Sequence, residues 1–111
     1  MADLTALKKE FSEVSDFLIA LGDEKRQAII LALMADKACQ GIRVGDLREA
    51  VNLSRPAISH HLKILREAKL IDYRTEGTKN YYYLTHETNK IEQLQKLLTN
   101  VTTIISQEDS K

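Results

Sequence analysis

The segment from residue 71 to residue 84 restricts the possible folds of this chain more than any other. It contains two runs, IDYRTE and KNYYYL, which alternate apolar and polar side chains and are separated by Gly77-Thr78. Alternation with a period of two is typical of a strand with one buried face, and a two-residue loop with glycine first is typical of a type II′ hairpin turn. The register predicts opposed pairs on the core side, which are Ile71 with Leu84 and Tyr73 with Tyr82.

The residues before this segment predict two helices joined by a tight turn. A short helix is expected over residues 45–51, Asn52-Leu53 forms the turn, and Ser54 begins a helix that continues to about Ala68. Serine is a favoured N-cap, and the proline at position 56 falls in the first turn, where its missing N–H costs nothing. Two helices in this arrangement form a helix-turn-helix. The expected inward residues are Leu47 and Val51 on the first helix, and Ile58, Leu62 and Leu65 on the second.

The outer face of the helix after Ser54 has the side chains that the major groove of DNA requires. His60 lies almost opposite the inward residues, and the small Ala57 and Ser59 allow a close approach to the bases. Arg55 and Lys63 can contact phosphate or guanine, whereas His60 either hydrogen-bonds a base edge or is merely solvated. The DNA-contacting residues predicted on this helix are Ser54, Arg55, Pro56, Ala57, Ser59, His60 and Lys63.

Three further helices are expected outside the helix-turn-helix. Apolar residues recur every three or four positions over residues 4–21, and again from Glu87 to about residue 105. This spacing is typical of a helix with one apolar stripe. Asp23 is expected to cap a helix through Ala35 that is apolar nearly all round, so we expect this helix at the centre of the core. Residues 42–44 have the composition of a short additional strand.

The two end helices carry more apolar surface than one small core can cover, which usually indicates a partner. We therefore expect a single domain over residues 1–111, in which helices 1–21 and 86–106 form a homodimer. The expected interface residues are Leu4, Leu7, Phe11, Val14, Leu94, Leu98, Val101 and Ile105.

Composition narrows the functional class. The chain of 111 residues has a formal net charge of zero, but residues 43–83 hold eight basic and five acidic side chains, so the charge is polarised along the sequence. The longest apolar run, residues 28–35, is too short to cross a membrane, and the N-terminus lacks an apolar signal-peptide core. The single Cys39 cannot form an intrachain disulfide. These features predict a cytoplasmic protein without a membrane partner.

Three stretches between residues 20 and 84 resemble the ArsR/SmtB family of winged-helix repressors in sequence, order and spacing. They are ALGDEKRQAIILAL, VGDLREAVNLSRPAISHHLKILREAKLI and EGTKNYYYL. The resemblance implies a mainly α (α+β) winged helix-turn-helix with about five helices and a two-stranded β-hairpin wing. It also implies a homodimer built from the first and last helices, and a wing that meets the DNA backbone or minor groove. The wing residues expected to contact double-stranded DNA are Arg74, Thr78 and Lys79.

Many members of this family sense metals, but neither of two known family sites is intact in this sequence. One site uses the cysteines of C-x-C-D-L, where this chain has Arg43-Val44-Gly45-Asp46-Leu47. The other pairs carboxylates and histidines across the last helices, where this chain has only His86 with Glu87 and Glu92. Tight zinc binding needs about four ligands, so we expect no metal and no cofactor. The adjacent His60 and His61 point about 100° apart on a helix and cannot share one ion, so His61 is expected to be a hydrogen-bonded packing residue.

The sequence therefore predicts a sequence-specific DNA-binding repressor that binds an inverted-repeat operator as a homodimer and responds to an unknown, non-metal effector. The alternative is a winged-helix module for protein–protein contact, which the basic Arg55, Lys63, Arg74 and Lys79 disfavour. No catalytic grouping is recognisable, so an enzyme is not expected. Cys39 is interpreted as a packing or loop residue, with a redox role as the alternative.

Overall fold

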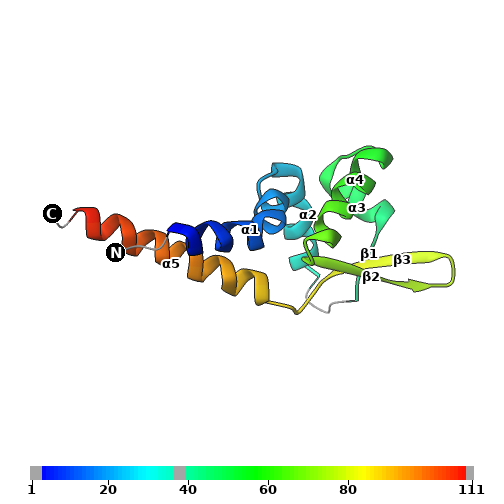
Figure 1. Ribbon diagram of the computed structural model, residues 1–111. Helices are drawn as coiled ribbons and strands as arrows, with labels where there is room; N and C mark the ends of the chain where they lie inside the picture. The colour runs from blue at the N-terminus through cyan, green and yellow to red at the C-terminus, as the bar shows by residue number, and fades with distance from the viewer. Residues whose placement is uncertain (1–3, 37–39, 110–111) are drawn as a thin grey trace. The chain divides into compact units, whose positions relative to one another are not determined.

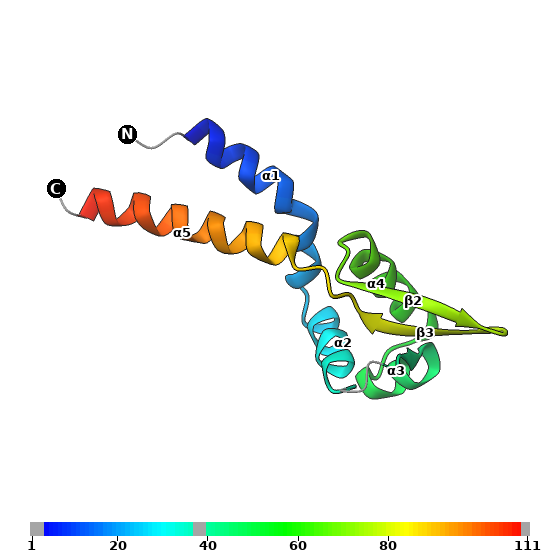
Figure 2. The same ribbon diagram turned by 90° about the horizontal axis from the view of Figure 1, so that it is seen from below.

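The computed structural model describes residues 4–36 and 40–109 and divides the chain into two compact units (Figures 1 and 2). One unit comprises residues 16–86, and the other comprises residues 1–15 together with residues 87–111. The position of Cys39 lies outside the described residues, so neither interpretation of this cysteine is tested.

The unit of residues 16–86 contains the last turns of α1, three further helices and one antiparallel sheet of strand order β1-β3-β2. Its elements are α1 (Leu4–Leu21), α2 (Glu24–Met34), β1 (Ile42–Arg43), α3 (Val44–Val51), α4 (Arg55–Glu67), β2 (Ile71–Glu76) and β3 (Lys79–Leu84). The tip of the β2–β3 hairpin extends beyond the helices of this unit in both views (Figures 1 and 2).

The β2–β3 hairpin has the predicted register. Ile71 pairs with Leu84 and Tyr73 with Tyr82. Gly77 has a φ of 63°, which residues with a side chain rarely adopt. Among the described non-glycine residues only Asn52 and Lys69 have a positive φ, so Thr78 does not. A positive φ at the first loop position alone defines a type II′ turn, so the prediction for this loop is confirmed.

The short strand expected over residues 42–44 is present as β1 (Ile42–Arg43), and it adds a third strand to the sheet by pairing with β3. Arg43 lies opposite Tyr81 in this pairing. Gly41, just before β1, has a φ of 93°, and a Cβ at this position would lie 2.8 Å from the Cβ of Tyr81. A glycine is therefore needed for the chain to approach β3 so closely.

The core of this unit forms from the apolar faces that the sequence predicts on α3, α4 and the hairpin. Its fully enclosed residues include Leu47, Ile58, Leu65 and Ile71. The prediction for α2 is wrong in part, because only one face of this helix is covered. Ile29 is buried, whereas Leu31 is 64% exposed and Met34 58% exposed. A helix that is apolar on all sides gives no sequence signal for the side that other elements cover.

The second unit consists of the first part of α1 and helix α5 (Asn89–Asp109), which lie side by side and run antiparallel (Figures 1 and 2). Lys90 Nζ donates to the Glu13 carbonyl oxygen at 2.8 Å, and Asn100 Nδ2 donates to the Glu10 carboxylate at 3.1 Å. Helix α5 begins later than the predicted residues 86–87. The reason is local, since the Thr88 carbonyl oxygen accepts the first helical hydrogen bond and its hydroxyl contacts the Glu92 carboxylate at 3.4 Å.

Candidate DNA-binding site

The helix-turn-helix consists of α3, a turn and α4. Asn52 ends α3 in the left-handed region with a φ of 54°, and its N–H donates to carbonyl oxygens of the last turn. Ser54 begins α4 and accepts a hydrogen bond on its hydroxyl oxygen from the Ala57 N–H at 3.3 Å. The predicted cap and the predicted turn are therefore both present, and they fix the direction in which α4 leaves α3.

Helix α4 separates an enclosed face from an exposed face. Ile58, Leu62 and Leu65 are 0–2% exposed and hold the helix on the core. The predicted DNA-contacting residues lie away from this side, with Ala57 half-buried and the others exposed. The exposed ones are Ser54, Arg55, Pro56, Ser59, His60 and Lys63. The structure thus brings the predicted residues of α4 together on one accessible surface.

The cations on this surface are available to a ligand. The side chain of Arg55 has no hydrogen-bond or ion-pair partner among residues 4–36 and 40–109. Lys63 Nζ lies 4.0 Å from Glu67 Oε1, but the side chains of this pair are 75% and 64% exposed. Exposed ion pairs contribute little, so a phosphate can replace Glu67 at small cost.

The predicted wing residues differ in their surroundings. Thr78 and Lys79 are exposed at the hairpin tip, and the Lys79 ammonium group has no hydrogen-bond or ion-pair partner in the described part of the chain. Arg74 is half-buried, pairs through Nε with Glu76 Oε1 at 3.3 Å, and lies 5.1 Å above the Tyr81 ring. The Glu76 carboxylate therefore neutralises part of the Arg74 charge toward a phosphate, whereas the charge of Lys79 is not paired.

Two exposed cations near this surface were missed by the sequence reasoning. Arg43 precedes α3 and Arg48 lies within it, and neither side chain has a hydrogen-bond or ion-pair partner among the described residues. Arg43 could have been predicted as an additional cation of this surface, because it stands just before the helix-turn-helix in the sequence. Its pairing with Tyr81 across the sheet could not be predicted from local sequence.

His61 behaves as predicted, since its ring is hydrogen-bonded and partly buried. Its Nδ1 lies 3.2 Å from Nη1 of Arg26, a buried arginine of α2. Burial lowers the pKa of His61, the positive charges of Arg26 and His60 lower it further, and the carboxylate of Asp23 opposes them. Asp23 caps α2 by accepting from the Lys25 and Arg26 N–H groups, and these hydrogen bonds lower the pKa of its own carboxyl.

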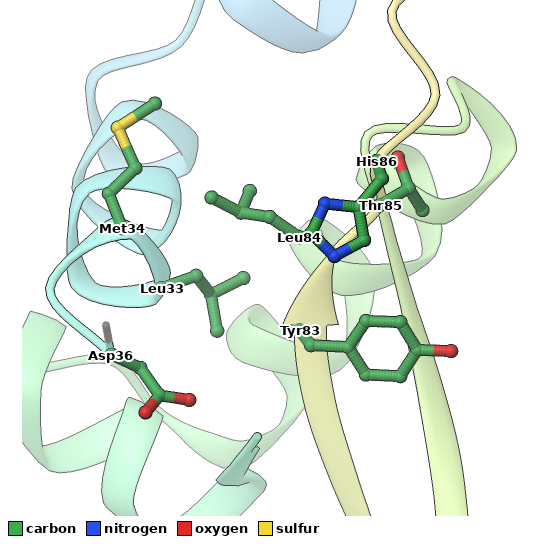
Figure 3. Close-up of a pocket in the computed structure, with 7 residues that line it drawn as sticks. All are labelled: Leu33, Met34, Asp36, Tyr83, Leu84, Thr85 and His86. Atoms are coloured by element: carbon green, nitrogen blue, oxygen red, sulfur yellow. The ribbon is translucent and has the colours of Figure 1, made fainter. Parts of the chain in front are cut away.

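A pocket of about 350 Å³ lies between the end of α2 and the end of β3 (Figure 3). Leu33 and Leu84 point toward each other across it, whereas the Tyr83 ring points away from α2 (Figure 3). The pocket has one carboxylate in its lining, that of Asp36, and this group already accepts a hydrogen bond from the Gly41 N–H at 2.8 Å. No group of three or more potential metal ligands occurs within residues 4–36 and 40–109.

None of the described helices combines the length and the apolar character needed to cross a bilayer.

Comparisons with known proteins agree with this geometry. A family model described as "Bacterial regulatory protein, arsR family" matches residues 23–73. The chain is 38% identical over 72 residues to a "Transcriptional repressor SmtB homolog" of Synechocystis sp., covering 65% of this chain but only 52% of that relative. It is 30% identical over 90 residues to an HTH-type transcriptional regulator of Methanocaldococcus jannaschii, covering 81% of this chain and 96% of the relative.

A solved structure extends the likeness beyond the matched segment. NolR from Sinorhizobium fredii superposes with a TM-score of 0.66 at 32% identity, covering 87% of this chain and 93% of NolR. The resemblance inferred from the sequence is thereby confirmed. With its helix-turn-helix, its β-hairpin wing and these relatives, the chain belongs to the ArsR family and is a DNA-binding transcriptional regulator.

Proposed function

We propose that this protein represses transcription as a homodimer on an inverted-repeat operator, with α4 of each protomer in the major groove. The observation that carries the proposal is the exposed surface of α4. It combines the unpartnered Arg55, the exposed His60 and Ser59, and a serine-capped N-terminus on a helix held firmly by its opposite face. Major-groove reading requires such a face of short or hydrogen-bonding side chains.

The contacts divide into those that read bases and those that position the protein. Arg55, Ser59 and His60 face outward from α4, where a groove-bound helix meets base edges. Lys79 lies beside the glycine turn of the hairpin, so it suits a phosphate of the backbone. Arg74 is a weaker candidate than Lys79, because its guanidinium is already engaged by Glu76 and Tyr81.

The proposed homodimer rests on apolar side chains that remain exposed on the end helices. Leu4 is 66% exposed, Leu98 55% and Ile105 54%, and Phe11 on α1 is 45% exposed. Val14 is only 1% exposed. It would therefore support the interface from within its own chain rather than contact the partner. The other predicted interface residues, Leu7, Leu94 and Val101, are half-buried.

The proposal is tested by selecting binding sites from a pool of random duplex DNA with the full-length protein. We expect an enriched inverted repeat whose half-site centres lie about 34–36 Å apart, or a multiple of that distance, because a two-fold dimer presents two α4 helices to one face of the duplex. Recovery of no common sequence would contradict operator binding. It would favour instead a winged-helix module that contacts another protein.

A further inference from the structure

Arg26 is the one charged residue that is buried in the described part of the chain, with 8% of its surface exposed. Its Nε donates to the Ala20 carbonyl oxygen at 3.0 Å, and its Nη2 donates to the Ile19 carbonyl oxygen at 2.9 Å. Both carbonyls belong to the last turn of α1, where helical partners run out. These bonds offset the cost of burying the guanidinium, and they fix it at the corner between α1 and α2.

The third contact of Arg26 reaches α4. Its Nη1 lies 3.2 Å from Nδ1 of His61. A guanidinium has donors only, so His61 Nδ1 must accept, and the ring must be neutral with its proton on Nε2. Arg26 therefore holds the middle of α4 against the end of α1 through a bond that exists only for one protonation state of His61.

The charges around His61 determine how this contact responds to pH. Arg26 and Asp23 face it from the start of α2, and His60 adjoins it on α4. Burial disfavours a protonated ring, Asp23 favours one, and Arg26 and His60 disfavour it, so the pKa of His61 lies below its ordinary value of 6.5. A lowered pKa means that the folded state loses stability as the pH falls from about 6.5 toward the lower folded value.

We infer that neutral His61 is a positioning residue for DNA binding, which Arg26 uses to hold α4 in the orientation that fits the major groove. Protonation of His61 turns its Nδ1 into a donor that faces the guanidinium, so the contact is lost and α4 is released from the α1–α2 corner. Operator affinity then falls as the pH falls. The inference rests on the proposed role of α4 as the reading helix.

The neighbouring His60 is exposed on the proposed DNA surface. Comparing the wild type with His61→Gln isolates the effect of His61, because His60 is present in both proteins. Glutamine can accept the Arg26 hydrogen bond through its side-chain oxygen and stays neutral at every pH.

The experiment is a titration of the selected duplex from pH 8 to pH 5.5 at constant ionic strength. We expect His61→Gln to bind within about threefold of the wild type at pH 8. At pH 5.5 we expect His61→Gln to bind the duplex more tightly than the wild type does. The difference should reach up to about tenfold per protomer for each pH unit by which DNA binding lowers the pKa of His61 in the wild type. His86→Gln, which removes an exposed histidine outside the proposed DNA surface, should follow the wild type. Parallel profiles of wild type and His61→Gln would overturn the inference.

An NMR measurement on the wild type keeps the inference testable if His61→Gln fails to fold. The ring nitrogen shifts of His61 should report an unprotonated Nδ1 at pH 7.5 and a pKa that is lower with the duplex than without it. An equal pKa in both states, or a protonated Nδ1 in the free protein, would overturn it. If the protein binds no duplex at all, the proposed function fails, while the spectrum of the free protein still decides whether the Arg26–His61 contact exists.

Discussion

The two compact units of this chain differ in how they use their apolar side chains. In residues 16–86 the apolar faces of α3, α4 and the hairpin are enclosed, and Leu47, Ile58 and Leu65 are fully buried. In the unit of α1 and α5, buried residues alternate with exposed ones, since Leu97 is 1% exposed and its neighbour Leu98 is 55% exposed. The helix-turn-helix and the hairpin thus enclose their apolar faces, whereas α1 and α5 leave several apolar side chains exposed along their length, as α2 does at Leu31 and Met34.

Under the proposed function, the two units have separate tasks. A helix that reads DNA must be held rigidly, and α4 is held by enclosed residues on one face and by the Arg26–His61 contact. The proposed dimer interface needs apolar side chains that are exposed within one chain, and Phe11 and Ile105 are exposed.

The largest effect is expected from a charge in the apolar stripe of α5. Leu98→Glu should convert the homodimer to a monomer and weaken operator binding by about 10²–10⁴-fold, because two linked half-site contacts become independent. Gln95→Glu adds the same charge at another exposed position of α5 and serves as the matched control. Sedimentation equilibrium gives the mass and anisotropy gives the affinity. A Leu98→Glu protein that remains dimeric would contradict the assignment of this stripe.

A core truncation should affect the two units unequally. Ile58→Ala should lower the free energy of unfolding by about 2–5 kcal/mol, because Ile58 is fully buried and a cavity remains. Ile105→Ala removes the same atoms from a side chain that is 54% exposed, so its cost should be much smaller at protein concentrations too low for dimers. Urea unfolding measures both. Equal losses would show that Ile105 is buried within its own chain.

A smaller loss is expected from the cap of α4. Ser54→Ala removes the acceptor of the Ala57 N–H and should destabilise residues 16–86 by about 0.5–2 kcal/mol. Ser54→Asp restores an acceptor and should recover most of that stability. Thermal unfolding of the two variants measures the difference. Equal melting temperatures for the alanine and aspartate proteins would show that a side-chain cap at position 54 does not stabilise α4.

The smallest effect is expected from metals. Neither of the two family metal sites has its ligands in this chain. Arg43 and Gly45 stand where the cysteines of one site would be, and the region of the other site has only His86 with Glu87 and Glu92. Zinc, cadmium and arsenite should therefore neither bind tightly nor release the operator. Competition with a chelating dye on untagged protein measures this. A submicromolar affinity would contradict the prediction.

The sequence predicts the helix-turn-helix and the hairpin well because their signals are local. Ser54 caps its own helix, Gly77 supplies its own turn, and alternation along each strand sets the face that is buried. Features that depend on distant residues could be predicted only in part. The short strand at residues 42–44 was predicted, but its pairing with β3 was not, because that pairing depends on Gly41 lying close to Tyr81, 40 residues further along the chain.

The same distinction between local and distant signals explains which parts of the candidate site could be predicted. The exposed residues of α4 follow from helical periodicity, so they could be predicted from the inward positions alone. The hydrogen-bond partner of His61 could not be predicted, because Arg26 lies 35 residues away and nothing in the local sequence pattern marks this arginine as buried. Likewise, the exposure of Leu31 and Met34 depends on which elements pack on α2, and the periodicity of that helix carries no such information.

The measurement that tests the account most directly compares cognate and scrambled duplexes for three variants at several salt concentrations. Arg55→Ala and His60→Ala should each cost about 1–3 kcal/mol per half-site on the cognate duplex and far less on the scrambled one, because they remove base contacts. Lys79→Ala should weaken both duplexes alike and flatten the salt dependence by about one ion per half-site. Lys96→Ala, an exposed cation of α5, is the matched control. An unchanged cognate-to-scrambled ratio for Arg55→Ala and His60→Ala would contradict the central claim that α4 reads the operator.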